Sequence, residues 1–285
     1  GVVLHLAEGT ELAAPLEILH LTTSAADGAL IAPRVLVTAG KSARGAVVEQ
    51  FVSLADTLHF SNAVTELVLA EESWVEHIRV QREGERAWHI GFTHAEQARA
   101  SHYRGFALSI GSKLSRHNLH ARLGGEQVET LMYGLYLTRN EQLADTHSAI
   151  YHDQPNCNSW EVYKGVLADK SRAVFNGKVF VEPIAQKTDA KQTNRNLLLS
   201  DEARVDTKPQ LEIFADDVKC THGATVGRLN DQQRYYLQTR GIGGRTAQEL
   251  LIWAFAAEVL TEVTIPTVRV GIERIVRERL EEMLG

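Results

Sequence analysis

The sequence predicts a mainly β protein that ends in a small α-helical domain. Short apolar or alternating runs, bounded by Gly, Asn, Asp and Ser, recur over the first four fifths of the chain, and such runs are typical of strands. No stretch between them has the ten or more residues of 3.6-residue periodicity that a crossover helix needs. The pattern therefore excludes an alternating α/β fold and favours an all-β body.

The expected strands are short and evenly distributed along the body. They cover residues 1–7, 16–21, 35–37, 47–52, 67–69, 106–110, 131–137, 173–175, 179–181, 196–199, 211–213 and 218–226. Val174 lies 24 residues before Leu198, which lies 22 before Cys220, and a repeat of about 20 to 25 residues fits one coil of a parallel β-helix. A β-sandwich with many short strands remains the alternative on periodicity alone.

After residue 226 the pattern changes to helices. Asn230 suits the N-cap of a helix through Gln238, and the glycines of residues 241–244 favour a turn at its C-terminal end rather than a dinucleotide loop. Thr246 and Glu249 have capping-box spacing, so a helix start is expected at 246, and residues 250–257 are apolar nearly all round. Pro266 opens a last amphipathic helix. We expect two domains, residues 1–226 and 227–285.

Composition excludes several functional classes. Hydrophobic residues make up 44% of the chain and charged residues 23%, as in ordinary globular proteins. Stretches without Asp, Glu, Lys or Arg reach nine residues, as in 130–138, which is too short for a membrane span. The net charge is −6, with no Lys/Arg block to hold a phosphate backbone. We therefore expect neither a membrane nor a nucleic acid as partner, and two cysteines without a signal peptide favour a cytoplasmic setting.

No complete active site is evident in the sequence. Gly40-Lys41-Ser42 lacks the earlier glycine of a phosphate loop, because Val35 occupies that position. The histidine pairs 89/94, 117/120 and 147/152 lack the helical context and the glutamate of a zinc protease motif, so we expect core or solvated histidines. A nucleophile elbow of the Gly-x-Ser-x-Gly type is also missing.

Cys220 and His222 form the one pair with a specific chemical interpretation. In a strand, residues two apart project from the same face, so a thiolate and an imidazole stand side by side there as metal ligands. Val218 shares this face, and an inert buried cysteine is therefore the alternative interpretation. Two ligands are too few for a tetrahedral metal, so further ligands must come from another chain. Cys157, 63 residues earlier, is expected about three coils and roughly 14 Å away.

Residues 171–227 resemble the SufD family of the SUF iron–sulfur cluster assembly machinery. The resemblance is carried by residues 172–177, 187–189, 196–199, 205–213 and 215–227, the last including Lys219-Cys220-Thr221-His222-Gly223, and continues through 236–237, 240–242 and 254–258. More loosely, it extends through residues 102–103 and 116–118 to about Pro15. The sister SufB family shares the architecture but has an acidic Glu-His-Glu version of the Cys220 region.

This resemblance implies a right-handed parallel β-helix followed by a helical domain. It also implies a scaffold rather than an enzyme, which pairs with a SufB-like subunit and binds a SufC-like ATPase through its C-terminal helices. Cys220 and His222 match the family's Cys-x-His near the SufB interface and are candidate ligands of the nascent cluster. The residues expected where SufC docks are Tyr236, Arg240, Gly241, Ile242, Ala254 and Phe255. No cofactor is expected to bind stably, and the iron–sulfur cluster is expected only transiently in the complex.

A homodimer in isolation is expected as a substitute for the SufB pairing, because an exposed β-helix end can pair with a copy of itself. The alternative function is a β-helix carbohydrate-active enzyme, which would need paired carboxylates on adjacent coils. Family members usually carry a helical region before the β-helix, whereas this sequence starts almost at the first coil.

Overall fold

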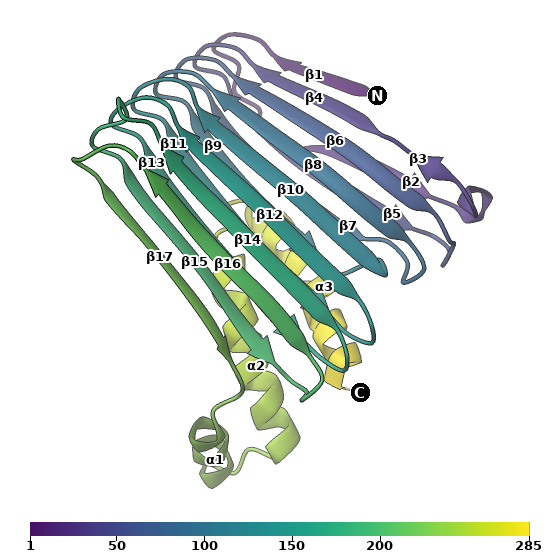
Figure 1. The fold of residues 1–285 in the computed structure, drawn as a ribbon. Coiled ribbons are helices and arrows are strands. Elements are labelled where there is room, and N and C mark those ends of the chain that lie inside the picture. The colour runs from purple at the N-terminus through teal and green to yellow at the C-terminus, as the bar shows by residue number, and fades with distance from the viewer. Residues whose placement is uncertain (285) are drawn as a thin grey trace.

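The structure is a parallel β-helix whose strands alternate between two sheets. The computed structural model describes residues 1–284. One sheet runs in the order β1-β4-β6-β8-β10-β12-β14-β16, with β3 beside β6, and the other runs β2-β5-β7-β9-β11-β13-β15-β17 (Figure 1). The mainly β prediction is confirmed, and so is the parallel β-helix in preference to a sandwich.

The elements of the first half are short at the N-terminus and settle to eight to ten residues per strand. They are β1 (Val2–Leu6), β2 (Leu16–Thr22), η1 (Ser24–Ala26), β3 (Leu30–Ile31), β4 (Arg34–Ala39), β5 (Arg44–Ser53), β6 (Phe60–Leu69), β7 (Trp74–Arg82), β8 (Trp88–Gln97) and β9 (His102–Ser109). The second half contains β10 (Leu114–Leu123), β11 (Glu129–Thr138), β12 (Leu143–His152), β13 (Asn158–Leu167), β14 (Arg172–Val181), β15 (Asp189–Leu198), β16 (Arg204–Ile213), β17 (Lys219–Gly227), α1 (Asp231–Thr239), α2 (Gly244–Leu260) and α3 (Pro266–Leu284).

The coil is longer than the sequence pattern predicted. Neighbouring residues in one sheet are 30 apart in sequence at Gly45 and Val75, and 31 apart at Ser159 and Ala190. The predicted repeat of 20 to 25 residues is wrong because neither of its intervals joins register neighbours. Leu198 and Cys220 lie in one sheet, but the neighbour of Cys220 is Ala190. Val174 lies in β14 of one sheet, whereas Leu198 lies in β15 of the other.

The turns along one side of the β-helix repeat with the same long period. Six non-glycine residues there have φ between 54° and 63°, namely Ser42, Glu72, Ala100, Gln127, Asn156 and Lys187. Each donates its backbone N–H to a carbonyl of the next coil at 2.7 to 3.3 Å. A left-handed conformation is unfavourable for L-residues, so these coil-to-coil hydrogen bonds must offset its cost.

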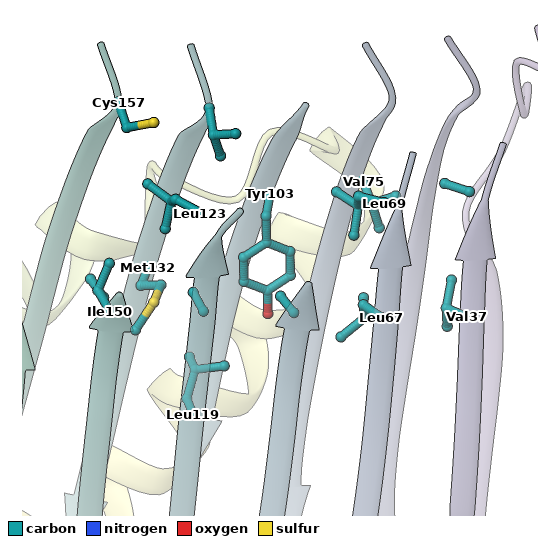
Figure 2. Close-up of a cluster of buried hydrophobic side chains, with 14 of the residues drawn as sticks. Val37, Leu67, Leu69, Val75, Tyr103, Leu119, Leu123, Met132, Ile150 and Cys157 are labelled. Atoms are coloured by element: carbon teal, nitrogen blue, oxygen red, sulfur yellow. The ribbon is translucent and has the colours of Figure 1, made fainter. Parts of the chain in front are cut away.

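An apolar core fills the space between the two sheets along one side. Figure 2 shows buried side chains from successive coils in contact there, including Val37, Leu67, Tyr103, Met132 and Ile150. They alternate along each strand with outward residues, as the two-residue period of a strand requires. Stacking like residues in adjacent coils makes this core continuous.

The helices α2 and α3 cover the outer face of the second sheet. Ile252 and Ala256 of α2 and Val276 of α3 share one buried cluster with outward residues of β5, β7, β9, β11 and β13, among them Ile78 and Phe106. The C-terminal helices therefore pack on the body and extend its core. Within residues 1–284 no helix is long and apolar enough to cross a membrane.

The helix boundaries agree with the sequence in two places and differ in one. The Asn230 side chain accepts hydrogen bonds from the backbone N–H groups of residues 232 and 233, which confirms the predicted cap of α1. Pro266 begins α3 as expected. The expected start at Thr246 is wrong, because α2 begins at Gly244 with Gly243 as its N-cap. The turn formed by the glycines supplies the helix start without a side-chain cap.

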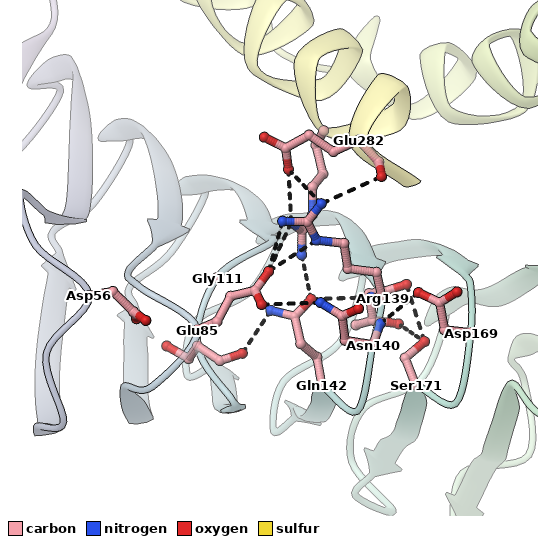
Figure 3. A network of polar contacts seen from close by, with 12 residues as sticks. Asp56, Glu85, Gly111, Arg139, Asn140, Gln142, Asp169, Ser171 and Glu282 are labelled. Carbon is pink, nitrogen blue, oxygen red and sulfur yellow. Dashed lines mark hydrogen bonds and ion pairs between the residues drawn. The ribbon is translucent and has the colours of Figure 1, made fainter. Parts of the chain in front are cut away.

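A polar network fixes the C-terminal end of α3 to the turns of the β-helix. Arg279, which is 7% exposed, bonds to Gln142 and to Glu282, and Arg139 contacts Glu85 and Glu282 at 2.9 and 3.3 Å (Figure 3). Burial of a guanidinium is costly unless its donors are paired. These contacts therefore hold α3 in one position on the body.

Candidate functional site

The β-helix is open at its C-terminal end. Within residues 1–284, β17 pairs with β15 alone and β16 with β14 alone, so both strands are edges (Figure 1). All nine residues of β17 and all ten of β16 are at least partly exposed, unlike those of β14 and β15 in the preceding coil. An edge strand presents unpaired backbone N–H and C=O groups that a strand of another chain can bind.

Cys220 and His222 lie on the inward face of this edge strand. They are the register neighbours of Ala190 and Gln192, both of which are buried in the preceding coil. Cys220 is half-buried against the apolar core, and this burial raises the pKa of its thiol. His222 is exposed, because no further coil covers it. The predicted side-by-side placement is therefore what the strand provides, with the histidine accessible and the thiol partly covered.

Cys157 does not belong to this pair. It is fully buried before β13, with its Sγ 3.3 Å from the carbonyl oxygen of Gly125. The register steps from β13 to β15 and from β15 to β17, so two coils, not the expected three, separate it from Cys220. The longer coil accounts for this correction.

Most of the remaining histidines are engaged with carboxylates or aromatic rings. Glu49 is buried and accepts hydrogen bonds from His20 and His77 at 2.9 and 3.0 Å, and these bonds hold its pKa below the ordinary value despite the opposing effect of burial. Glu83 is held in the same way by His59 and His89. Residues 1–284 contain no group of three or more His, Cys, Asp or Glu able to hold a metal ion.

The predicted histidine pairs are divided between the interior and the surface. Burial lowers the pKa of His117 well below its ordinary value, and it lowers that of His152 to about 4, so both rings are kept neutral in the core. His94 and His120 lie outside, where both pack against Phe92. Neither arrangement resembles a protease site.

The residues predicted to contact an ATPase lie on α1 and α2. Tyr236 is 58% exposed, with the Arg240 guanidinium 5.2 Å from its ring centroid, and it lines a hollow of about 350 Å³ between the two helices. Gly241 has φ +83°, a conformation that favours glycine and turns the chain from α1 into α2. Ile242 is half-buried in this turn. Helix α1 has no buried residue, and α2 is the element that it packs against.

Ala254 and Phe255 face different environments on α2. Ala254 is exposed, whereas the Phe255 ring is partly buried with the Lys164 ammonium 4.4 Å from its centroid. The same ammonium donates to the Phe255 carbonyl oxygen at 2.9 Å and pairs with Glu258. Phe255 therefore helps to attach α2 to β13, and a change there would disturb the position of the helix as well as its surface.

Comparison with known proteins places this geometry in a family. A family model of the SUF system FeS cluster assembly SufBD core domain matches residues 20–255. The iron–sulfur cluster assembly protein SufD of Escherichia coli is 40% identical over 266 residues, which are 91% of this chain and 62% of that protein. The chain belongs to the SufBD core family. An iron–sulfur cluster assembly SufBD family protein of Synechocystis is 36% identical over 277 residues, 94% of this chain and 61% of that protein.

This SufBD core chain spans about three fifths of the length of the curated relatives it matches. The matched region includes the β-helix from β2 onward, the open end and most of α2. Cys220, His222, Tyr236 and Arg240 all lie inside it. The open edge at β17 and the surface formed by α1 and α2 are the two candidate surfaces, and both are parts of the family core.

The two candidate surfaces of this SufBD core chain are joined by a short link. Only residues 228–230 separate the end of β17 from the start of α1. Arg228 in this link forms an ion pair with Asp201, beside the last turn of the β-helix.

Sequence reasoning missed the polar residues that lie inside the β-helix behind His222. Gln192 is the neighbour of His222 in β15, and Glu161 is the neighbour of Gln192 in β13. Burial raises the pKa of Glu161 to about 7. A sequence marker of the turns does exist, since Ala-x-x-Ser or Ala-x-x-Thr occurs at 70–73, 98–101, 168–171 and 185–188, each time with the hydroxyl bonded to the alanine carbonyl.

Proposed function

We propose that this chain is the scaffold core of a subunit that supports the assembly of nascent iron–sulfur clusters. Its open β-helix end pairs with a SufB-like subunit, and its C-terminal helices bind a SufC-like ATPase. The chain is not itself an enzyme in this proposal, and ATP hydrolysis belongs to the ATPase partner. The observation that carries the proposal is the placement of Cys220 and His222 on the inward face of an unpaired edge strand.

The chemistry of the pair supports a shared site. A thiolate is a soft ligand and an imidazole a borderline one, and both bind iron in clusters. Two ligands leave the coordination shell incomplete, and residues 1–284 hold no group of three that could complete it. A partner strand that paired with β17 would place side chains of the partner next to the inward-facing Cys220 and His222. The cluster is the product handed on, bound only while it forms.

The link between β17 and α1 supports a role for the ATPase. Helix α1 has no buried residue, so its position depends on its contacts with α2 and on any partner that binds it. Movement of α1 on ATP binding or hydrolysis would reach β17 through residues 228–230. We propose that this coupling opens or closes the interface where the cluster is built, in the cytoplasmic setting expected from the sequence.

One experiment tests both surfaces of the proposal. The full-length protein is co-expressed anaerobically with its SufB-like and SufC-like partners, and the purified complex is scored for subunit content and iron–sulfur absorbance. We expect His222→Ala to leave the complex intact and to lower the cluster absorbance severalfold. Thr221→Ala, on the outward face of the same strand, is the matched control and should change neither quantity. An unchanged cluster yield in His222→Ala would remove the ligand role.

The second arm uses neighbouring tyrosines on α1. We expect Tyr236→Ala to release the ATPase while the pairing with the SufB-like subunit persists. Tyr235→Ala, which is 68% exposed but lies outside the hollow between α1 and α2, should retain the ATPase. Recovery of the chain only as a homodimer would show that a second copy occupies the open end. Equal ATPase binding by both variants would contradict the docking surface.

A further inference from the structure

A buried amide inside the β-helix lies directly behind His222. Gln192 is 1% exposed, and its Nε2 donates to Oε2 of Glu161 at 2.7 Å. The amide oxygen Oε1 is buried and has no hydrogen-bond partner among residues 1–284. The register pairs Gln192 with His222 across one strand spacing, on the same inward face. An unpaired buried acceptor therefore belongs to the residue that is the register neighbour of the candidate ligand.

The fold makes room for this amide and holds it in place. A Cβ atom at Gly177, on the opposite sheet, would lie 2.2 Å from Nε2 of Gln192, so the amide occupies the space that any other residue at 177 would need. Glu161 is itself fully buried, and its carboxyl group anchors the amide by accepting the hydrogen bond from Nε2 of Gln192. With Nε2 committed to Glu161, the free acceptor capacity of Gln192 lies at Oε1. Buried acceptors in native proteins nearly always find a partner, and the ring N–H of His222 is a suitable one.

We propose that Gln192 is a positioning residue that selects the ring tautomer of His222. The His222 side chain, which is exposed in the structure, turns inward so that Oε1 of Gln192 accepts the N–H of one ring nitrogen, and the other ring nitrogen is left unprotonated and directed to the open end. An imidazole binds iron only through an unprotonated nitrogen, and the hydrogen bond made by the other nitrogen decides which one is free. The role of the free nitrogen as an iron ligand rests on the proposed function, but the choice of tautomer is a property of this chain alone.

The tautomer can be measured without any metal or partner. Two-bond ¹⁵N–¹H correlation spectra of the full-length protein with ¹⁵N-labelled histidine, recorded at pH 8, report which ring nitrogen of His222 carries the proton. His222→Gln assigns the resonance by its loss. We expect one tautomer to exceed the other by about tenfold or more in the wild type, as a single buried hydrogen bond provides. In Gln192→Met the ratio should fall to that of a free histidine.

The controls separate positioning from general packing. Asn194→Leu also replaces a buried amide on the inward face of β15 by an apolar chain of similar size, but Asn194 lies beside Ala224, so the His222 ratio should stay at the wild-type value. Where Gln192→Met does not fold, Gln192→Asn retains a polar group but is one methylene too short and should lose the selection as well. A wild-type ratio in folded Gln192→Met or Gln192→Asn would overturn the inference.

The failure of this inference can be told apart from failure of the proposed function. If the tautomer is selected by Gln192 but His222→Ala assembles clusters normally, the positioning holds and the ligand role falls. If His222→Ala loses the cluster while Gln192→Met keeps the wild-type tautomer ratio, the ligand role holds and the positioning falls.

Discussion

The middle coils of the β-helix and its last coil both have side chains that face inward. The two regions differ in whether a further coil covers those side chains. In β13 the inward residues Glu161 and Tyr163 are almost completely buried, whereas in β17 the inward Cys220 is half-buried and His222 exposed. β13 lies between β11 and β15, but β17 has a neighbour on one side only. A parallel β-helix thus turns core positions into surface positions wherever the stacking stops.

This difference assigns separate roles to the two regions. A polar side chain in a middle coil can find a partner only within the chain, as Glu49 does with two histidines and Thr65. A polar side chain in the last coil is free to find its partner in another protein. Substitutions at matched positions of the two regions should therefore act on stability in the middle and on assembly at the end.

The largest expected effect contrasts Phe175 with its neighbour in the last coil. Phe175 is fully buried in β14 and is paired in register with Thr207 of β16, which is only partly buried. Phe175→Ala should lower the free energy of unfolding by about 3 to 5 kcal/mol, because it leaves a cavity in a closed coil. Thr207→Ala should cost less than about 1 kcal/mol. Urea unfolding followed by circular dichroism measures both, and equal losses would contradict the contrast.

The second effect concerns the buried carboxyl behind the site. Burial raises the pKa of Glu161 from 4.5 to about 7, against the hydrogen bond from Gln192. The fold therefore favours the protonated form, so this contribution to stability is present below pH 4.5 and is lost as the pH rises to about 7. Glu161→Gln should stabilise the protein by up to about 3 kcal/mol at pH 8 and leave its stability unchanged at pH 4.

Unfolding experiments at the two pH values test this expectation, with His222→Gln as the exposed counterpart from the last coil. That variant should change the free energy of unfolding by less than about 0.5 kcal/mol at pH 8. A stability gain in Glu161→Gln that is the same at pH 4 and pH 8 would show that the carboxyl does not titrate as expected.

The smallest effect is expected at glycines. A Cβ atom at Gly165 in β13 would lie 2.0 Å from the ring of Tyr136, whereas one at Gly223 in β17 would meet nothing within 4 Å. Gly165→Ala should cost about 1 to 3 kcal/mol through overpacking, and Gly223→Ala less than about 0.5 kcal/mol. Thermal unfolding midpoints of the two variants decide the matter, and a tolerated Gly165→Ala would mean that the middle coils can expand.

Local patterns in the sequence predicted the elements better than their arrangement. Alternation within short runs and the cap at Asn230 depend on neighbours within a few residues, so both were predictable. The extent of the strands was not, since β14 was expected as two strands and β7, β8, β10, β12 and β13 were missed. The coil length was not, because the predicted repeat joined β14 to β15 of the opposite sheet and then Leu198 to Cys220, which share a sheet but are not in register. Cys220 and His222 were found because they are two residues apart. Gln192 and Glu161 lie 30 and 61 residues before His222 and become neighbours only through the register.

The sequence by itself determined a mainly β body, helices from Asn230 onward and a thiol beside an imidazole on one face of a strand. These features follow from side-chain periodicity and local backbone preferences. Only the tertiary structure decided that this strand is the exposed edge of a stack, that α2 and α3 pack on the body and that a buried amide lies behind His222. The physical reason is that burial and hydrogen-bond partners are set by which coils are stacked, and stacking joins residues about 30 positions apart that share no local pattern.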